Sequence, residues 1–262
     1  MVPCAVPGLP ELGAIAVVSI ARQPSAAPAP YLYRTLRSLF ASMPAGIEVN
    51  VLVGSDEAAY ASHERLAAEL TEPVARHVHV LPARAAEARH LRAHAGLRAR
   101  TTWNHARALQ SHRGPGRLLF LEDDVCWSRA ATRFVSGACH LPAPELFSLY
   151  HGAGYDPYCT KDDPCRKEQL EIVRADRRGL LFSCCQALLY SGELAREVGA
   201  YLSLRLGNEP TDSMMGHYFR RRAILLGYAR PSLVQHIGVT SSGLSAFHQA
   251  ACFAADDTSE GD

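Results

Sequence analysis

The chain has 262 residues, 48% hydrophobic and 20% charged, enough to bury a large core as one α/β domain. Its 27 basic and 26 acidic residues nearly cancel, which argues against a nucleic-acid partner held by bulk positive charge. No apolar run approaches the roughly 20 residues of a membrane span, and no secretory signal pattern opens the chain. We therefore expect a soluble, cytoplasmic protein, and the sequence leaves its oligomeric state open.

The N-terminal half alternates between strand and helix patterns. Gly13–Ile20 is a continuous apolar run typical of a strand buried on both faces, and Tyr31–Met43 has apolar residues at helical spacing. A strand over Ile47–Val53, a helix over Glu57–Leu70 and a strand over Val74–Leu81 follow. Two successive βα units predict a parallel sheet with right-handed crossovers, so the expected fold class is α/β.

The next segment, Pro82–Gly114, is rich in arginine and contains one acid, Glu87. It is either a solvated helical face or an anion-binding wall, and the sequence supports both interpretations. Thr101 and Thr102 predict the N-cap of a short helix over Trp103–Leu109. The seven arginines of the segment are Arg84, Arg89, Arg92, Arg98, Arg100, Arg107 and Arg113.

The C-terminal half continues the same alternation. The segment Gly152–Arg178 is rich in glycine, proline and charge and predicts a long loop or lid. We divide the chain into an N-terminal extension (1–12), one folded domain (13–250) and a disordered acidic tail (251–262). Further strands are expected over Arg117–Leu121, Leu146–Tyr150, Leu180–Tyr190 and Ser232–Gly238, and helices over Ser128–Cys139, Gly192–Leu204 and Thr211–Ala223.

Eight cysteines raise the question of disulfides or a zinc site. They show no paired Cys-x-x-Cys spacing, so a structural zinc site is not expected. Cys184 and Cys185 are adjacent in an apolar run, where small buried thiols are common. Cys159 and Cys165 could close a short loop, but without a secretory signal reduced thiols are the default.

Three successive acids, Glu122, Asp123 and Asp124, follow the apolar strand pattern Arg117–Leu121. Carboxylates avoid the edge of an apolar core unless a cation compensates them, and ligands bind at the carboxyl ends of strands in open α/β sheets. Adjacent carboxylates suit a hard cation such as Mg²⁺ or Mn²⁺. A solvated turn is the alternative, but the position after a buried strand favours a metal site.

The segment LFLEDDV resembles the Asp-x-Asp-type metal motif of nucleotide-sugar glycosyltransferases with the GT-A fold. ARPSLVQHIGVTSSG resembles the end of the GT-A domain in the N-acetylglucosaminyltransferase IV family and its relatives, and SIAR before a Tyr/Leu-rich helix fits that family's donor-binding start. The resemblance implies a single Rossmann-like domain with a mostly parallel central sheet flanked by helices. It also implies a UDP-sugar donor and a Mn²⁺ or Mg²⁺ cofactor.

The resemblance assigns roles to individual residues. Asp124 matches the acid that binds the metal, and Asp123 and Glu122 would orient the ribose and a metal-bound water. His236 matches a C-terminal histidine that completes the metal shell, although a hydrogen-bonded core histidine is an equal alternative. Asp212, at the start of a predicted helix, is the candidate general base, although it could instead cap that helix.

Several further residues are candidates for the donor or acceptor site. Glu209 is the reserve candidate for the general base, and Gln186, a polar residue in an apolar run, needs a partner and could face the acceptor. The same positions could instead serve a turn, an exposed surface or a backbone hydrogen bond. The donor-binding candidates are Ser19, Ile20, Ala21, Arg22, Asp56, Arg100 and Asn104.

These residues together predict a metal-dependent glycosyltransferase. It would move N-acetylglucosamine or another hexose from a UDP-sugar to a hydroxyl of a glycan, lipid or small molecule, with inversion implied by the resemblance. A nucleotidyltransferase is one alternative, but SIARQPSAAPAP lacks its glycine-rich phosphate loop. A nucleotide-sugar binding module without turnover is the other, and the intact acids disfavour it.

Overall fold

The computed structural model of the chain describes residues 12–19, 29–44, 46–54, 65, 68, 78–94, 96–150, 169–175, 185–238, 250 and 253. Among these, no helix is long and apolar enough to cross a membrane. The strands are β1 (Leu12–Ser19), β2 (Val49–Val53), β3 (Val78–Leu81), β4 (Arg117–Glu122), β5 (Val125–Trp127), β6 (Leu146–Ser148), β7 (Gln169–Arg174), β8 (Ala187–Ser191), β9 (Leu225–Arg230) and β10 (Val234–His236). The helices are α1 (Ala29–Phe40), α3 (Ala85–His94), α4 (Leu97–Ser111), α5 (Arg129–Cys139), α6 (Gly192–Ser203) and α7 (Thr211–Arg222).

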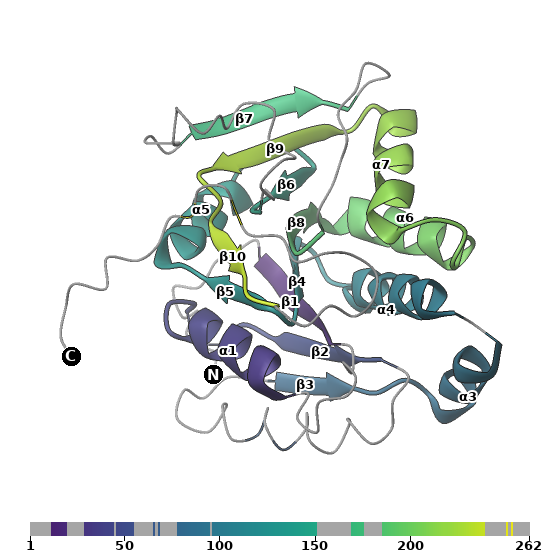
Figure 1. Cartoon of the computed structure of the whole chain (residues 1–262). Coiled ribbons are helices and arrows are strands. Elements are labelled where there is room, and N and C mark those ends of the chain that lie inside the picture. Colours follow the sequence, from purple (N-terminus) through teal and green to yellow (C-terminus); the bar gives the residue numbers. More distant parts are fainter. Residues whose placement is uncertain are drawn as a thin grey trace, which may run out of the picture.

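Eight strands form one twisted sheet in the order β3-β2-β1-β4-β8-β6-β9-β7 (Figure 1). The half built from β3, β2, β1 and β4 is parallel throughout, as the βα pattern predicts. The other half is mixed, because β8 runs antiparallel to both β4 and β6, and β7 runs antiparallel to β9. The expected α/β class is confirmed, with parallel pairings concentrated on the N-terminal side of the sheet.

Alternating side chains of the central strands build two core layers, one on each face of the sheet. Ile15 and Val17 of β1 pack into the layer that includes α1 and α5. Ala16 and Val18 of the same strand pack into the layer that includes α4, α6 and α7. Helices therefore cover both faces (Figure 1), and the strands between them read as continuous apolar runs.

Several sequence predictions need correction. The helix expected over Trp103–Leu109 starts at Leu97, so Thr101 and Thr102 lie inside α4 rather than at its N-cap. Part of the expected lid forms strand β7, which pairs with β9. Strand β9 itself was not predicted from the sequence. The final strand is shorter than expected and pairs with β5 in a separate two-stranded sheet. Apart from residues 65 and 68, the predicted helix over 57–70 lies outside the described residues, as does most of the predicted lid.

Ser128 connects helix α5 to the segment that leads into β10. Its hydroxyl accepts a hydrogen bond from the Ala131 backbone N–H at 3.1 Å and donates one to the Leu233 carbonyl at 2.7 Å. The first bond caps α5, as the residue type predicts. The second fixes the chain one residue before β10, so one buried hydroxyl supports both elements.

We predict that Ser128→Ala lowers the free energy of unfolding by about 2 kcal/mol, through loss of the cap and of a buried hydrogen bond. Ser191→Ala is the matched control, because Ser191 caps α6 through the Leu194 backbone N–H in the same way. That variant should lose about 1 kcal/mol. Urea unfolding measures both, and equal losses would contradict the role given to the bond with Leu233.

Candidate active site

The carboxyl ends of β1 and β4 form the natural ligand-binding edge of the sheet. The chain proceeds from β1 to β2 and β3 on one side, and then returns to place β4 on the other side of β1. A reversal of this kind opens a crevice beyond the strand ends, where open α/β sheets bind ligands. β1 ends at Ser19 and β4 at Glu122, and Val18 pairs directly with Glu122. The acids that follow β4 therefore stand at the switch point.

Asp123 is the first residue after β4, at this switch point, and is almost fully buried, with 2% of its surface exposed. The Ser19 hydroxyl donates a hydrogen bond to its Oδ2 at 2.6 Å. A buried carboxylate needs such donors, because an unsatisfied one is costly. Two predicted donor-site residues that are 104 positions apart in the sequence are thus in direct contact at the ends of β1 and β4.

Thr35 of α1 holds the turn that carries Asp123 and Asp124. Its buried Oγ1 accepts a hydrogen bond from the Val125 backbone N–H at 3.1 Å. The same hydroxyl lies 2.8 Å from the Asp123 carbonyl oxygen and 2.7 Å from the Val125 carbonyl oxygen, and its single proton can be donated to either. One side chain therefore ties both ends of the turn to α1. Sequence reasoning missed Thr35, because nothing local marks a threonine inside an amphipathic helix.

Helix α4 holds the ends of the parallel strands from the opposite face. Asn104, a predicted donor-site residue, donates to the Leu52 carbonyl at 3.1 Å and to the Ser19 carbonyl at 3.4 Å. Arg107 donates to the carbonyls of Val53, Leu81 and Pro82 and lies over the Trp103 ring. Burial lowers the pKa of the Arg107 guanidinium, and nearby Glu87 partly offsets this effect.

The arginine-rich segment does not act as one unit. Arg107 bonds to backbone carbonyls, and Arg100 is half-buried on α4. Four other arginines of the segment are exposed, as the solvated-face interpretation expects: Arg84, Arg89, Arg98 and Arg113.

Asp124 and His236, the two predicted metal ligands, lie in direct contact. His236 Nε2 lies 2.9 Å from Asp124 Oδ2, and both residues are buried. Antiparallel pairing of β5 with β10 places Val125 opposite His236, and the Ile237 backbone N–H donates to the Asp124 carbonyl at 2.8 Å. The Tyr150 and His236 rings pack in a T-shaped arrangement, with 6.3 Å between their centroids. A carboxylate and an imidazole are thus fixed side by side.

Gly238 completes the cradle around this pair. A Cβ atom added to Gly238 would overlap the carboxylate of Asp124 and approach His236 Nε2 to 3.0 Å. A residue with any side chain would displace one partner. The absence of a Cβ is therefore a steric requirement at this position, and the sequence motif alone does not reveal it.

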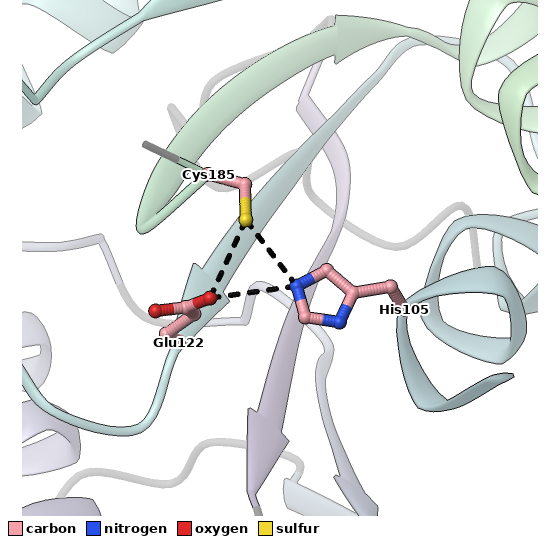
Figure 2. A group of neighbouring side chains, drawn as sticks. All are labelled: His105, Glu122 and Cys185. Atoms are coloured by element: carbon pink, nitrogen blue, oxygen red, sulfur yellow. Dashed lines mark hydrogen bonds and ion pairs between the residues drawn. The ribbon is translucent and has the colours of Figure 1, made fainter. Parts of the chain in front are cut away.

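Glu122 points away from Asp123 and Asp124, toward α4. Its Oε1 lies 3.4 Å from His105 Nε2 and 3.5 Å from Cys185 Sγ (Figure 2). Strand alternation explains the direction, because Leu118 and Phe120 of β4 also pack on the α4 side. His105 and Cys185 were not predicted as site residues, and the sequence gives no spacing signal for them. Each acid of the triplet therefore has partners of its own.

The two candidate bases have different surroundings. Asp212 is half-buried in the first turn of α7, where its Oδ1 accepts a hydrogen bond from the Ser213 backbone N–H at 2.8 Å. Its neighbour Thr211 is bonded to Thr102 of α4 at 2.9 Å, which ties this helix start to the helix carrying Asn104. Glu209 is half-buried and pairs with His217 at 3.2 Å. This pairing makes Glu209 the weaker candidate.

Of the remaining predicted residues, Gln186 is described by the structure and four donor-site candidates are not. Gln186 is half-buried; its backbone carbonyl accepts a hydrogen bond from the Glu122 N–H, and its Oε1 has no hydrogen-bond partner among the described residues. That orphaned acceptor agrees with the expectation that Gln186 needs a partner. The donor-site candidates outside the described residues are Ile20, Ala21, Arg22 and Asp56.

Sequence comparison finds no matching family model and no matching curated protein. Solved structures do match. The galactosyltransferase LgtC, in complex with donor and acceptor sugar analogues, gives a TM-score of 0.52 at 13% identity over 82% of this chain. TarS from S. aureus gives 0.51 at 10% identity over 92%, and GalNAc-T7 with UDP, GalNAc and Mn²⁺ gives 0.52 at 15% identity over 86%.

The fold is that of the GT-A glycosyltransferases. Identities this low establish the fold and not the substrate. The narrower resemblance to the N-acetylglucosaminyltransferase IV family stays a prediction. The chain spans 72% of the LgtC chain, 60% of the TarS chain and 43% of the GalNAc-T7 chain.

We predict that Thr35→Val lowers the free energy of unfolding by about 1–3 kcal/mol, because the Val125 N–H loses its buried acceptor. Thr35→Ser is the control, since it keeps the hydroxyl and removes one methyl group, at a cost of about 1 kcal/mol. Urea unfolding of both variants checks the comparison. If serine destabilised the protein more than valine, packing rather than the hydroxyl would hold the turn.

Proposed function

We propose that this protein is a metal-dependent glycosyltransferase that moves a hexose or N-acetylhexosamine from a UDP-sugar to an acceptor hydroxyl. One observation carries the proposal: the Asp123–Ser19 and Asp124–His236 pairs stand together at the switch point of a GT-A fold. A buried acidic edge beside an imidazole suits a cationic cofactor and a phosphate-bearing ligand. Solved GT-A structures that hold UDP, sugars or Mn²⁺ give the same expectation.

The residues fit a divalent metal. Asp124 offers a carboxylate oxygen and His236 an imidazole nitrogen, a donor set that suits Mn²⁺ better than Ca²⁺. The bare backbone of Gly238 leaves room beside both atoms, where any side chain would fill the space. When bound there, the metal would neutralise the diphosphate and stabilise it as it leaves.

The chain itself would supply binding, orientation and proton transfer. Asp123, fixed by Ser19, would hold ribose hydroxyls at the ends of β1 and β4. Asp212 would take the proton of the acceptor hydroxyl as that oxygen attacks the anomeric carbon, which is the step an inverting transfer requires. The Asp212 carboxylate accepts one backbone hydrogen bond through Oδ1. Its partial exposure would let an acceptor reach it.

The donor can be tested directly. In a panel of UDP-sugars with Mn²⁺ and candidate acceptors, one donor should raise the Tm and release UDP as its sugar moves to an acceptor hydroxyl, and EDTA should abolish both effects. Asp212→Asn should keep donor binding and slow sugar transfer by about 100-fold or more. A nucleotidyltransferase would instead release pyrophosphate from an added nucleoside triphosphate, and a binding module would bind the UDP-sugar without releasing UDP. Either result, or binding that ignores EDTA, would refute the proposal.

We predict that Gly238→Ala abolishes Mn²⁺-dependent binding of UDP, because the added methyl group would separate Asp124 from His236. Gly137→Ala is the matched control, since a Cβ at Gly137 of α5 meets nothing within 4 Å. The control should bind UDP as the wild type does. Calorimetric titration of UDP with Mn²⁺ measures both variants, and normal binding by Gly238→Ala would place the metal elsewhere.

A further inference from the structure

A second group of side chains at the end of β4 is not used by the proposed transfer. His105 comes from α4, Glu122 from the last position of β4, and Cys185 from the residue two before β8 (Figure 2). His105 and Cys185 are buried, with 1% and 8% of their surfaces exposed, and Glu122 is half-buried. Their side chains point toward one another from three separate elements (Figure 2). Their potential ligand atoms lie within 4.8 Å of one another.

The separations between these atoms match a tetrahedral zinc site. Bonds of about 2.3 Å to sulfur and about 2.0–2.2 Å to nitrogen and oxygen, at tetrahedral angles, place the three ligand atoms about 3.4–3.6 Å apart. The observed separations are 3.4 Å from His105 Nε2 to Glu122 Oε1, 3.5 Å from Cys185 Sγ to that oxygen, and 3.6 Å from Sγ to Nε2. One Zn²⁺ ion could bond all three without moving them.

The hydrogen bonding of His105 prepares it as a ligand. Its Nδ1 lies 2.9 Å from the Thr101 carbonyl, an atom that can only accept, so Nδ1 carries a proton. In the neutral ring, Nε2 therefore presents its lone pair to Glu122 and Cys185. Such an outer hydrogen bond from the second nitrogen is the usual support of a metal-bound histidine. The ring also lies against Phe120, at 4.9 Å between centroids, which restricts its rotation.

The same geometry argues against a nucleophilic cysteine. A Cys–His–acid relay needs the thiol and the acid on opposite nitrogens of the imidazole. Here Cys185 and Glu122 both face Nε2, while Nδ1 faces a backbone carbonyl. Nε2 and the Glu122 oxygen both present lone pairs at 3.4 Å, and a proton or a cation shared between them would relieve their repulsion.

We propose that His105, Glu122 and Cys185 bind Zn²⁺, with the fourth tetrahedral position left for water or an external ligand. On binding, bonds form from zinc to nitrogen, oxygen and sulfur, and the Cys185 thiol releases its proton to solvent. A thiolate and an imidazole select Zn²⁺ over Mg²⁺, which prefers oxygen ligands. This site is therefore chemically distinct from the Asp124–His236 pair. Cysteine spacing could not predict it, because it uses one cysteine and three elements.

The test uses the purified full chain, freed of metal and titrated with Zn²⁺ and separately with Co²⁺. The wild type should bind one Zn²⁺ through Cys185 and, with Co²⁺ in its place, gain the near-ultraviolet absorption of a cobalt–thiolate bond. Cys185→Ser should lose that absorption and bind Zn²⁺ at least about 100-fold more weakly, a larger loss than that of an outer partner. Cys139→Ser is the control, since Cys139 is a buried thiol of α5. It should behave as the wild type does.

Two further variants separate this site from the proposed donor site. Asp124→Asn should keep the cobalt–thiolate absorption, whereas Glu122→Gln should weaken Zn²⁺ binding. The wild-type titration decides the proposal even if Cys185→Ser fails to fold. Absence of the cobalt–thiolate absorption from the wild type would leave a proton between His105 and Glu122 and overturn the proposal. So would an absorption that survives in folded Cys185→Ser, because it would come from another cysteine.

Discussion

Three carboxylates in three successive residues cannot share one buried site, and the end of β4 is built around that constraint. Like charges in a low-dielectric environment repel, and each buried acid needs its own donor or cation. Strand alternation sends Glu122 to the α4 face, and the turn after β4 places Asp123 against Ser19 and Asp124 against His236. The division of the triplet determines which chemistry each acid can perform.

The supporting residues act mainly on backbone carbonyls at the ends of the parallel strands. Asn104 bonds to the ends of β1 and β2, Arg107 bonds to those of β2 and β3, and Thr35 secures the turn after β4. Parallel strands leave such groups unpaired where they end, and burying them without partners costs free energy. Satisfying them from α1 and α4 keeps the ligand edge rigid, which favours preorganised binding.

The sequence was most informative where local pattern and burial agree. Apolar runs predicted β1, β2 and β4, because those strands are buried on both faces. Helical spacing predicted α1, because that helix is buried on one face. It failed at β9, where Gly227 and Arg230 weaken the strand pattern and pairing with β6 and β7 supplies the stability. It also failed at the start of α4, because tertiary packing overrode the capping preference of Thr101 and Thr102.

The site shows the same limit. The Asp124–His236 contact followed from a resemblance that spans both segments, whereas Thr35, His105, Cys185 and Gly238 carry no local signal. Each of these four contacts residues that are distant in the sequence. The ligands of the two candidate metal sites differ in chemical softness as well as in position. A thiolate beside an imidazole and a carboxylate beside an imidazole prefer different metals, so the two sides of β4 could keep two metals apart by ligand type alone.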